Sequence, residues 1–177
     1  LSKENISDLY DPYPKPTHFL PGKPEENKLP FVSVRKAFAD LKEPGESDDI
    51  AQNSLSRAKF MGKHCQGQTE VKLDGIGPTI RSEHHGNIEF RRLSKENGGQ
   101  YFDELNKGMA QRRLTIRECA RLQTFPDDYE FVWRKQGDKP GLSASAAYKL
   151  IGNAVPPLLG YHIAKRLEDN WNLYFKE

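Results

Sequence analysis

Residues 112–129 read RRLTIRECARLQTFPDDY, and this stretch carries the clearest local structure signal in the chain. Thr115 is followed three residues later by Glu118, the spacing of a capping box, in which each side chain accepts a hydrogen bond from the other residue's backbone N–H. A helix is therefore expected to begin after Thr115 and to end before Pro126. Its body carries Cys119, Ala120, Leu122 and Gln123.

Two further helices are expected downstream. The first spans about Ser145 to Leu150 and is broken by Gly152. The second starts at Pro157, because proline suits the first turn of a helix, and it runs to about Asn172. This short stretch is crowded with apolar side chains, namely Tyr148, Ile151, Val155, Leu158, Leu159, Ile163 and Leu167. Left in water they would form a larger patch than soluble monomers usually show, so they need a surface to bury against.

The upstream part of the chain begins with a proline-rich stretch. Residues 11–30 contain six prolines, and each fixes φ and lacks a backbone N–H. Residues 1–30 are therefore expected to form an extended connector without regular elements. In residues 32–41 the apolar side chains recur at helical intervals and Ser33 can serve as an N-cap, which predicts a short helix.

The middle of the chain has weaker patterning. Short strands are expected at residues 79–80 and 88–90, where apolar residues flank polar turn-forming stretches. Short strands mixed with short helices indicate an α+β fold. The pattern places a small domain over residues 31–135 and a C-terminal helical segment over residues 143–177.

Charge is distributed unevenly along the 177 residues. Lys plus Arg is 27 and Asp plus Glu is 25, so the net charge of +2 excludes a uniformly basic, chromatin-type protein. Residues 1–50 hold 7 basic and 10 acidic side chains, whereas residues 51–95 hold 8 basic and 4 acidic ones. The basic middle stretch is therefore the candidate for contact with a polyanion.

Several protein classes are disfavoured. No apolar run approaches the roughly 20 residues of a membrane span, and the first residues lack a signal-peptide pattern, so a cytosolic protein is expected. Cys65 and Cys119 lie far apart without the spacing of metal ligands, which argues against a disulfide framework or a zinc site. His84 and His85 have no further ligand nearby, so no metal site is expected there.

Two of these stretches resemble signature blocks of the DNA (cytosine-5) methyltransferase family. Residues 112–129 are similar to the ninth block, and residues 151–157, IGNAVPP, are similar to the tenth, in the family's order. The stretch GPTIRSEHHGNIEFRR at residues 77–92 resembles the target-recognition region that precedes the ninth block. The resemblance implies that residues 31–135 form the target-recognition domain and include the ninth block.

The resemblance implies that the loop within residues 77–92 reads DNA, and its side chains suit that task. Arginine pairs with guanine, asparagine with adenine, and glutamate with the amino group of cytosine. A polar surface turn is the alternative interpretation of the loop. The expected DNA-contacting residues are Thr79, Arg81, Glu83, His84, His85, Asn87, Arg91, Arg92 and Arg113.

The arginines of the ninth block have two interpretations. Arg117 and Arg121 stand four residues apart and share one face of the expected helix. They can contact phosphate, or they can belong to a solvated face or a structural Arg–Glu network. The resemblance favours a mainly architectural role for this block.

The tenth block implies a cofactor contact. By position in the family, Asn153, Ala154 and Val155 are expected to help bind S-adenosylmethionine, with the asparagine at its amino-acid end and the valine forming an apolar wall. The alternative is a glycine–proline break between two helices that binds no ligand.

The family's catalytic residues are missing from this sequence. The family attacks C6 of cytosine with the thiolate of a Pro-Cys pair, whereas Cys65 follows His64 and Cys119 follows Glu118. The glycine-rich cofactor loop is missing as well. The chain therefore resembles the C-terminal part of such an enzyme, either a fragment or the second subunit of a split one, and it is expected to be inactive alone. Its C-terminal helices would belong to a Rossmann-like domain outside this chain.

These features together predict the target-recognition and C-terminal part of an enzyme that transfers methyl from S-adenosylmethionine to cytosine at a specific duplex site. Double-stranded DNA and an N-terminal catalytic domain or subunit are the expected partners, within a restriction–modification system of the bacterial cytosol, at the nucleoid. A non-enzymatic, sequence-specific DNA-binding module derived from such an enzyme is the alternative, and a structural interaction protein is a third. The tenth block favours the first, because a pure DNA binder has no need of a cofactor-pocket element.

Overall fold

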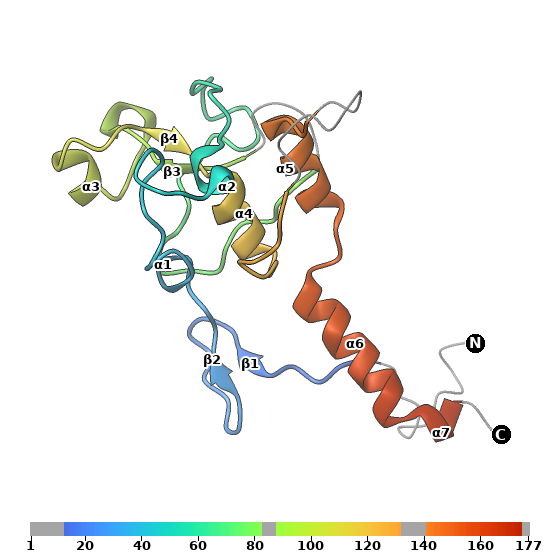
Figure 1. The fold of residues 1–177 in the computed structure, drawn as a ribbon. Helices are drawn as coiled ribbons and strands as arrows, with labels where there is room; N and C mark the ends of the chain where they lie inside the picture. The colour runs from blue at the N-terminus through green and yellow to red at the C-terminus, as the bar shows by residue number, and fades with distance from the viewer. Residues whose placement is uncertain (1–12, 83–87, 132–140, 175–177) are drawn as a thin grey trace. The chain divides into compact units, whose positions relative to one another are not determined.

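The computed structural model describes residues 13–82, 88–131 and 141–174 (Figure 1). The chain forms two compact units. One comprises Phe31–Ala154, and the other joins Leu1–Pro30 to Val155–Glu177. Within the described residues, no helix combines the length and the apolar character needed to cross a membrane.

Helix α4 (Ile116–Leu122) lies at the centre of the 31–154 unit. The predicted capping box is confirmed: the Thr115 hydroxyl accepts from the Glu118 N–H at 3.0 Å, and the Glu118 carboxylate accepts from the Thr115 N–H at 2.8 Å. Ile116, Cys119 and Ala120 have no exposed surface. The cap therefore fixes where α4 starts, and its apolar side chains build the core around it.

Three short helices pack against α4 (Figure 1). They are α1 (Val34–Ala37), α2 (Ile50–Asn53) and α5 (Ala144–Asn153). The predicted N-cap of α1 is confirmed, because the Ser33 hydroxyl accepts from the Lys36 N–H. A mixed unit of short helices and strands results, in agreement with the expected α+β class.

Helix α5 belongs to a different part of the chain from the one that the sequence-based boundaries gave it. The expected C-terminal segment began at residue 143, whereas α5 packs within the 31–154 unit and continues through Gly152. Ala147, Tyr148 and Ile151 are buried. The Tyr148 hydroxyl donates to the Leu114 carbonyl at 2.6 Å and accepts from the Ser56 N–H at 3.0 Å. These contacts hold α5 to residues far upstream in the chain.

The strands of the 31–154 unit are short. β3 (Phe90–Arg92) pairs antiparallel with β4 (Arg112–Arg113), with an irregularity between Phe90 and Arg92. The 3-10 helix η3 (Lys95–Asn97) and helix α3 (Asp103–Asn106) lie between them in the chain. The strand expected at residues 88–90 thus begins two residues later, and residues 79–80 form no strand, although Ile80 is buried.

The other unit also departs from expectation in one respect. β1 (His18–Phe19) and β2 (Leu29–Pro30) pair in parallel, so the proline-rich stretch does contain a regular element. Proline has no backbone N–H to donate. It is tolerated at position 30 because β2 is an edge strand of a two-stranded sheet. The unit also contains α6 (Pro157–Asp169), which starts at the predicted proline, and α7 (Trp171–Tyr174).

We expect Thr115→Ala to lower the free energy of unfolding by about 2–3 kcal/mol, because it removes the cap of α4 and leaves buried Gln52 without its donor. In the native chain the Thr115 hydroxyl donates to the side-chain oxygen Oε1 of Gln52 at 2.7 Å. Urea denaturation followed by circular dichroism measures the loss. The control is Ser143→Ala, which removes the exposed cap of α5 and should cost about 1 kcal/mol. Equal losses in the two variants would contradict a structural role for the buried cap.

Candidate nucleic-acid interface

The residues expected to contact DNA fall into three groups. Glu83, His84, His85 and Asn87 lie outside the described residues. Thr79 is exposed and Arg81 is half-buried, so both can meet a ligand. Arg91, Arg92 and Arg113 lie on or beside the β3–β4 pair.

Arg92 is the centre of an internal ion-pair network. Its side chain is 1% exposed, and its guanidinium donates to Glu43 at 2.6 Å, to Glu104 at 2.6 Å and to the Ala110 carbonyl at 2.9 Å. Arg91 also pairs with Glu104, at 2.5 Å. A buried guanidinium that has lost its hydration is stable only with such partners. In this structure Arg92 therefore has an internal, structural role in place of the expected DNA contact.

Arg112 extends the network to α4. Its guanidinium bridges Glu43, at 3.0 Å, and Glu118, at 2.8 Å. Burial raises the pKa of Glu43, but hydrogen bonds from Arg92 and Arg112 outweigh it and lower the pKa to about 2. The carboxylate stays charged at neutral pH and ties the segment after α1 to both arginine-bearing strands.

The Arg113 side chain anchors a loop by donating hydrogen bonds to main-chain carbonyl oxygens of that loop. The side chain is 1% exposed and stacks over the Phe90 ring, with 3.8 Å from the guanidinium carbon to the ring centroid. It donates to the carbonyl oxygens of Gly67 and Ile88, and to that of Ala58 at 3.3 Å. Arg113 therefore holds the loop of residues 58–67 against β3 and, in this arrangement, is not available to a phosphate.

The anchored loop and its neighbours in the chain carry exposed positive charge. Arg57, Lys59, Lys63 and Lys72 are exposed. Arg57 and Lys59 line one hollow and Lys63 and Lys72 a second, and the two hollows share Asn97. We call these four residues the basic surface. The sequence indicated the charge excess of this stretch but not which cations remain exposed.

Arg81 and Glu89 stand on either side of residues 83–87 in the sequence. Arg81 donates to the Gln66 side chain at 2.6 Å, which connects it to the anchored loop. Burial raises the pKa of Glu89, and its Oε2 has no hydrogen-bond partner among the described residues. That oxygen is itself buried, so it offers no acceptor to a ligand in this arrangement.

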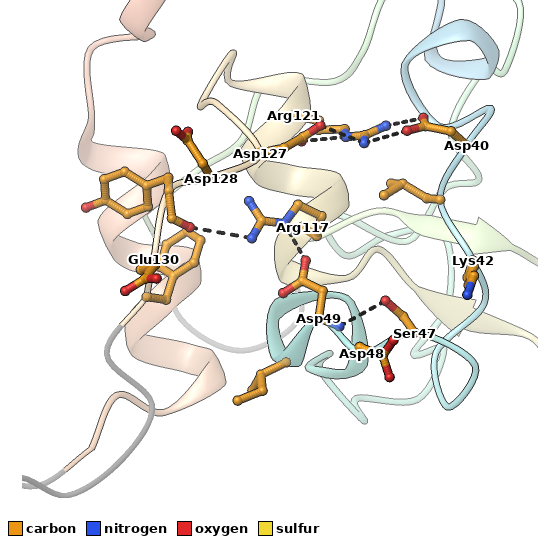
Figure 2. Close-up of a pocket in the computed structure, with 14 residues that line it drawn as sticks. Asp40, Lys42, Ser47, Asp48, Asp49, Arg117, Arg121, Asp127, Asp128 and Glu130 are labelled. Carbon is orange, nitrogen blue, oxygen red and sulfur yellow. Dashed lines mark hydrogen bonds and ion pairs between the residues drawn. The ribbon is translucent and has the colours of Figure 1, made fainter.

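The arginines of α4 face an acidic hollow of about 860 Å³, shown in Figure 2. Arg121 bridges Asp40 and Asp127, and Arg117 pairs with Asp49 at 2.5 Å. The hollow has six carboxylates against three cations: Asp40, Asp48, Asp49, Asp127, Asp128 and Glu130 against Lys42, Arg117 and Arg121. Such a surface repels phosphate, which supports the architectural interpretation of this block.

The expected cofactor contacts lie at and just after the end of α5. Asn153 is exposed, and Val155 is 64% exposed. The Gln123 side chain donates to the Ala154 carbonyl at 3.0 Å, which fixes the turn to the end of α4. Gly152 contacts the main chain of Arg81 and Ser82. The structure thus brings the end of α5, where the cofactor contacts are expected, next to Arg81 and Ser82 of the expected recognition region, which no sequence spacing indicated.

Neither cysteine resembles a catalytic nucleophile. Cys119 has no exposed surface, and burial raises the pKa of its thiol well above the usual value. Such a thiol is inert at neutral pH, and Cys119 is a packing residue of the hydrophobic core. Cys65 is half-buried in the anchored loop.

Comparison with known proteins identifies similar chains. The model of the family described as C-5 cytosine-specific DNA methylase matches residues 25–169. The type II methyltransferase M.MthTI of Methanothermobacter thermautotrophicus is 25% identical over 93% of this chain and 54% of its own length. M.BsuRI of Bacillus subtilis is 31% identical over 99% of this chain and 38% of its own length. M.BspRI of Lysinibacillus sphaericus is 29% identical over 98% of this chain and 39% of its own length. The chain thus spans about half or less of these relatives.

We expect Glu43→Gln to lower the free energy of unfolding at pH 7 by about 2–3 kcal/mol, because it removes the charge that Arg92 and Arg112 share. The folded pKa of Glu43 is about 2, below the ordinary value of 4.5, so its contribution is present above about pH 4.5 and is lost as the pH falls toward 2. The difference between native chain and variant should therefore shrink over this range in urea denaturation.

The control for this prediction is Glu46→Gln. Glu46 is an exposed glutamate three residues away, so its replacement should leave stability nearly unchanged at every pH. A Glu43→Gln difference that stays constant between pH 7 and pH 2 would refute the role of the charge.

Proposed function

The chain belongs to the family of C-5 cytosine-specific DNA methylases, and on that premise we propose that it supplies the target-recognition part of a DNA (cytosine-5) methyltransferase. Its relatives are type II methyltransferases, which supports an enzyme of restriction–modification type. In this proposal the 31–154 unit binds a specific duplex site, and a catalytic part of the same enzyme carries out the methyl transfer.

The observation that carries the proposal is the division of the cations into two sets. Arg92 and Arg112 are used in internal ion pairs. Arg113 holds the 58–67 loop, which carries Lys59 and Lys63 and contacts Arg81 through Gln66. The basic surface supplies exposed charge for phosphates, which gives affinity without sequence preference. Arg81, together with the expected loop residues after it, would supply the base contacts that give specificity.

The cofactor proposal rests on the residues at the end of α5. Asn153 offers an exposed amide that can donate and accept hydrogen bonds, and Val155 offers an exposed apolar side chain. This pair fits a ligand with a zwitterionic end beside an apolar part, as S-adenosylmethionine has. When bound, that cofactor supplies the methyl group. Asn153, Ala154 and Val155 would form one side of its site and the catalytic part the rest.

The partner proposal rests on α6 and α7. These helices expose Leu158, Leu159, Ile163, Leu167 and Trp171. Burying one such aliphatic side chain contributes about 1.5–3 kcal/mol, so several together can hold a second polypeptide or domain without a covalent link. The partner we propose is the Rossmann-like catalytic part, which would also supply the Pro-Cys nucleophile that this chain lacks.

We expect the chain to bind duplex DNA with a salt-dependent affinity, because the basic surface releases counterions from phosphates. Lys59→Ala should weaken binding to all sequences and lower the slope of log affinity against log salt by about 1. Arg81→Ala should instead cost about 1–3 kcal/mol of discrimination at one base pair. Lys165→Ala is the matched control, since Lys165 is exposed on α6 and pairs with Glu168. Fluorescence anisotropy measures the dissociation constants for DNA. Equal effects of Lys59→Ala and Lys165→Ala on these constants would contradict the proposed interface.

We expect the chain alone to transfer no labelled methyl group to DNA and to gain activity when a polypeptide with the Pro-Cys block of the same enzyme is added. Ile163→Asp should prevent that gain and the co-elution of the two polypeptides, because it places a charge in the row Leu159, Ile163 and Leu167. Ala164→Asp adds the same charge beside that row and is the control. Methyl transfer by the chain alone would refute the proposed division of the enzyme.

A further inference from the structure

Gly152 lies directly against the main chain of two residues of the expected recognition segment. A Cβ atom at position 152 would lie 2.3 Å from the Arg81 carbonyl carbon, 2.5 Å from its oxygen and 2.5 Å from the Ser82 nitrogen. Real Cβ atoms essentially never approach other atoms closer than 3.0 Å, and here the neighbour is backbone, which cannot rotate away. Only glycine allows the end of α5 to come this close.

A second glycine, at the other end of the same segment, contacts the end of a side chain instead of backbone. A Cβ atom on Gly77 would lie 2.6 Å from a methyl carbon of Leu122, the last residue of α4. Between these two glycines, Ile80 is buried whereas Thr79 is exposed. Residues 77–82 therefore pack on α4 at one end and lie against the backbone of α5 at the other.

The two helices that hold the segment are themselves joined. Gln123, which follows α4, donates from its side chain to the Ala154 carbonyl at 3.0 Å. Ala154 in turn donates its N–H to the Ile151 carbonyl at 3.2 Å, and the Ile151 side chain is buried. The turn that follows α5 is thus attached to α4 on one side and pressed on Arg81 and Ser82 on the other.

We propose that the ends of α4 and α5 form a clamp that positions residues 77–82 for DNA reading, with Gly152 and Gln123 as its positioning residues. The inference rests on the proposed function, since it assigns to these two residues the placement of Thr79 and Arg81. Neither Gly152 nor Gln123 needs to touch DNA. Asn153 and Ala154 lie at the same end of α5, so the clamp would also place the expected cofactor contacts beside residues 77–82.

The clamp can be tested by limited trypsin digestion of the chain, without DNA. Trypsin cleaves after Arg81, the residue whose carbonyl meets Gly152, and this cleavage requires the segment to open locally. Gly152→Ala should raise the rate of cleavage after Arg81 by about tenfold, because the added methyl group forces the two backbones apart. Cleavage after Lys107, which is exposed elsewhere in the same unit, is the internal reference and should stay within about twofold.

Two further variants keep the test decisive. Gly160→Ala adds the same methyl group in α6, where nothing lies within 4 Å, and should change neither cleavage rate. Gln123→Ala removes the hydrogen bond to Ala154 without adding atoms, and it should raise cleavage after Arg81 by about threefold. It serves as the test if Gly152→Ala does not fold. Cleavage that rises equally after Arg81 and Lys107, or that rises at neither, would overturn the clamp.

A DNA-binding measurement separates positioning from general packing. Duplexes bound by each variant are selected from a random-sequence pool, and affinity is measured as a function of salt. The variants at positions 152 and 123 should lower the enrichment of the preferred sequence by about tenfold and leave the salt slope unchanged, because the basic surface is intact. If the variants instead bind DNA more weakly, with an altered salt slope, and still enrich the preferred sequence, the positioning role is overturned. A native chain that selects no sequence would refute the proposed function, while digestion still decides whether the clamp exists.

Discussion

The whole 31–154 unit depends on one buried carboxylate, that of Glu118. The side chain is 2% exposed, and it caps α4 through the Thr115 N–H while accepting two hydrogen bonds from Arg112. A buried charge without partners would cost several kcal/mol, so the cap, the strand β4 and the helix must form together. Through Arg112 and Glu43 the same network reaches Arg92 on β3. The Glu118 carboxylate therefore both starts helix α4 and joins it to the β3–β4 pair.

Local signals in the sequence predicted local structure. The capping box at Thr115, the N-cap at Ser33 and the start of α6 at Pro157 were all correct, because each depends on residues within one helical turn. The place of α5 in the 31–154 unit was missed, since it depends on Tyr148 contacting Leu114 and Ser56, which are distant in the sequence. Hydrophobic periodicity reports that a face is buried, not what covers it.

The arginines show the same limit at the candidate site. Their side chains are chemically alike, and the sequence alone gave Arg92 and Arg113 the same DNA-contacting role as Arg81. Burial separates them, because Arg92 meets Glu43, 49 positions away in the chain, and Arg113 meets main-chain carbonyls. No spacing rule identifies such partners. The arginines of α4 are paired in the same way. The aspartates that hold Arg117 and Arg121 make the hollow of Figure 2 acidic.

Arg113 has a consequence for how this unit can diversify. It holds the 58–67 loop through the carbonyl oxygens of Ala58 and Gly67, which every amino acid possesses. The side chains of the loop are therefore free to change while the anchor is preserved, whereas a lysine at position 113 could not reach several carbonyls at once, because it lacks the planar fork of arginine. A scaffold built in this way can change the charge of the surface that its loop presents by substitutions in the loop, without having to evolve a new fold around them.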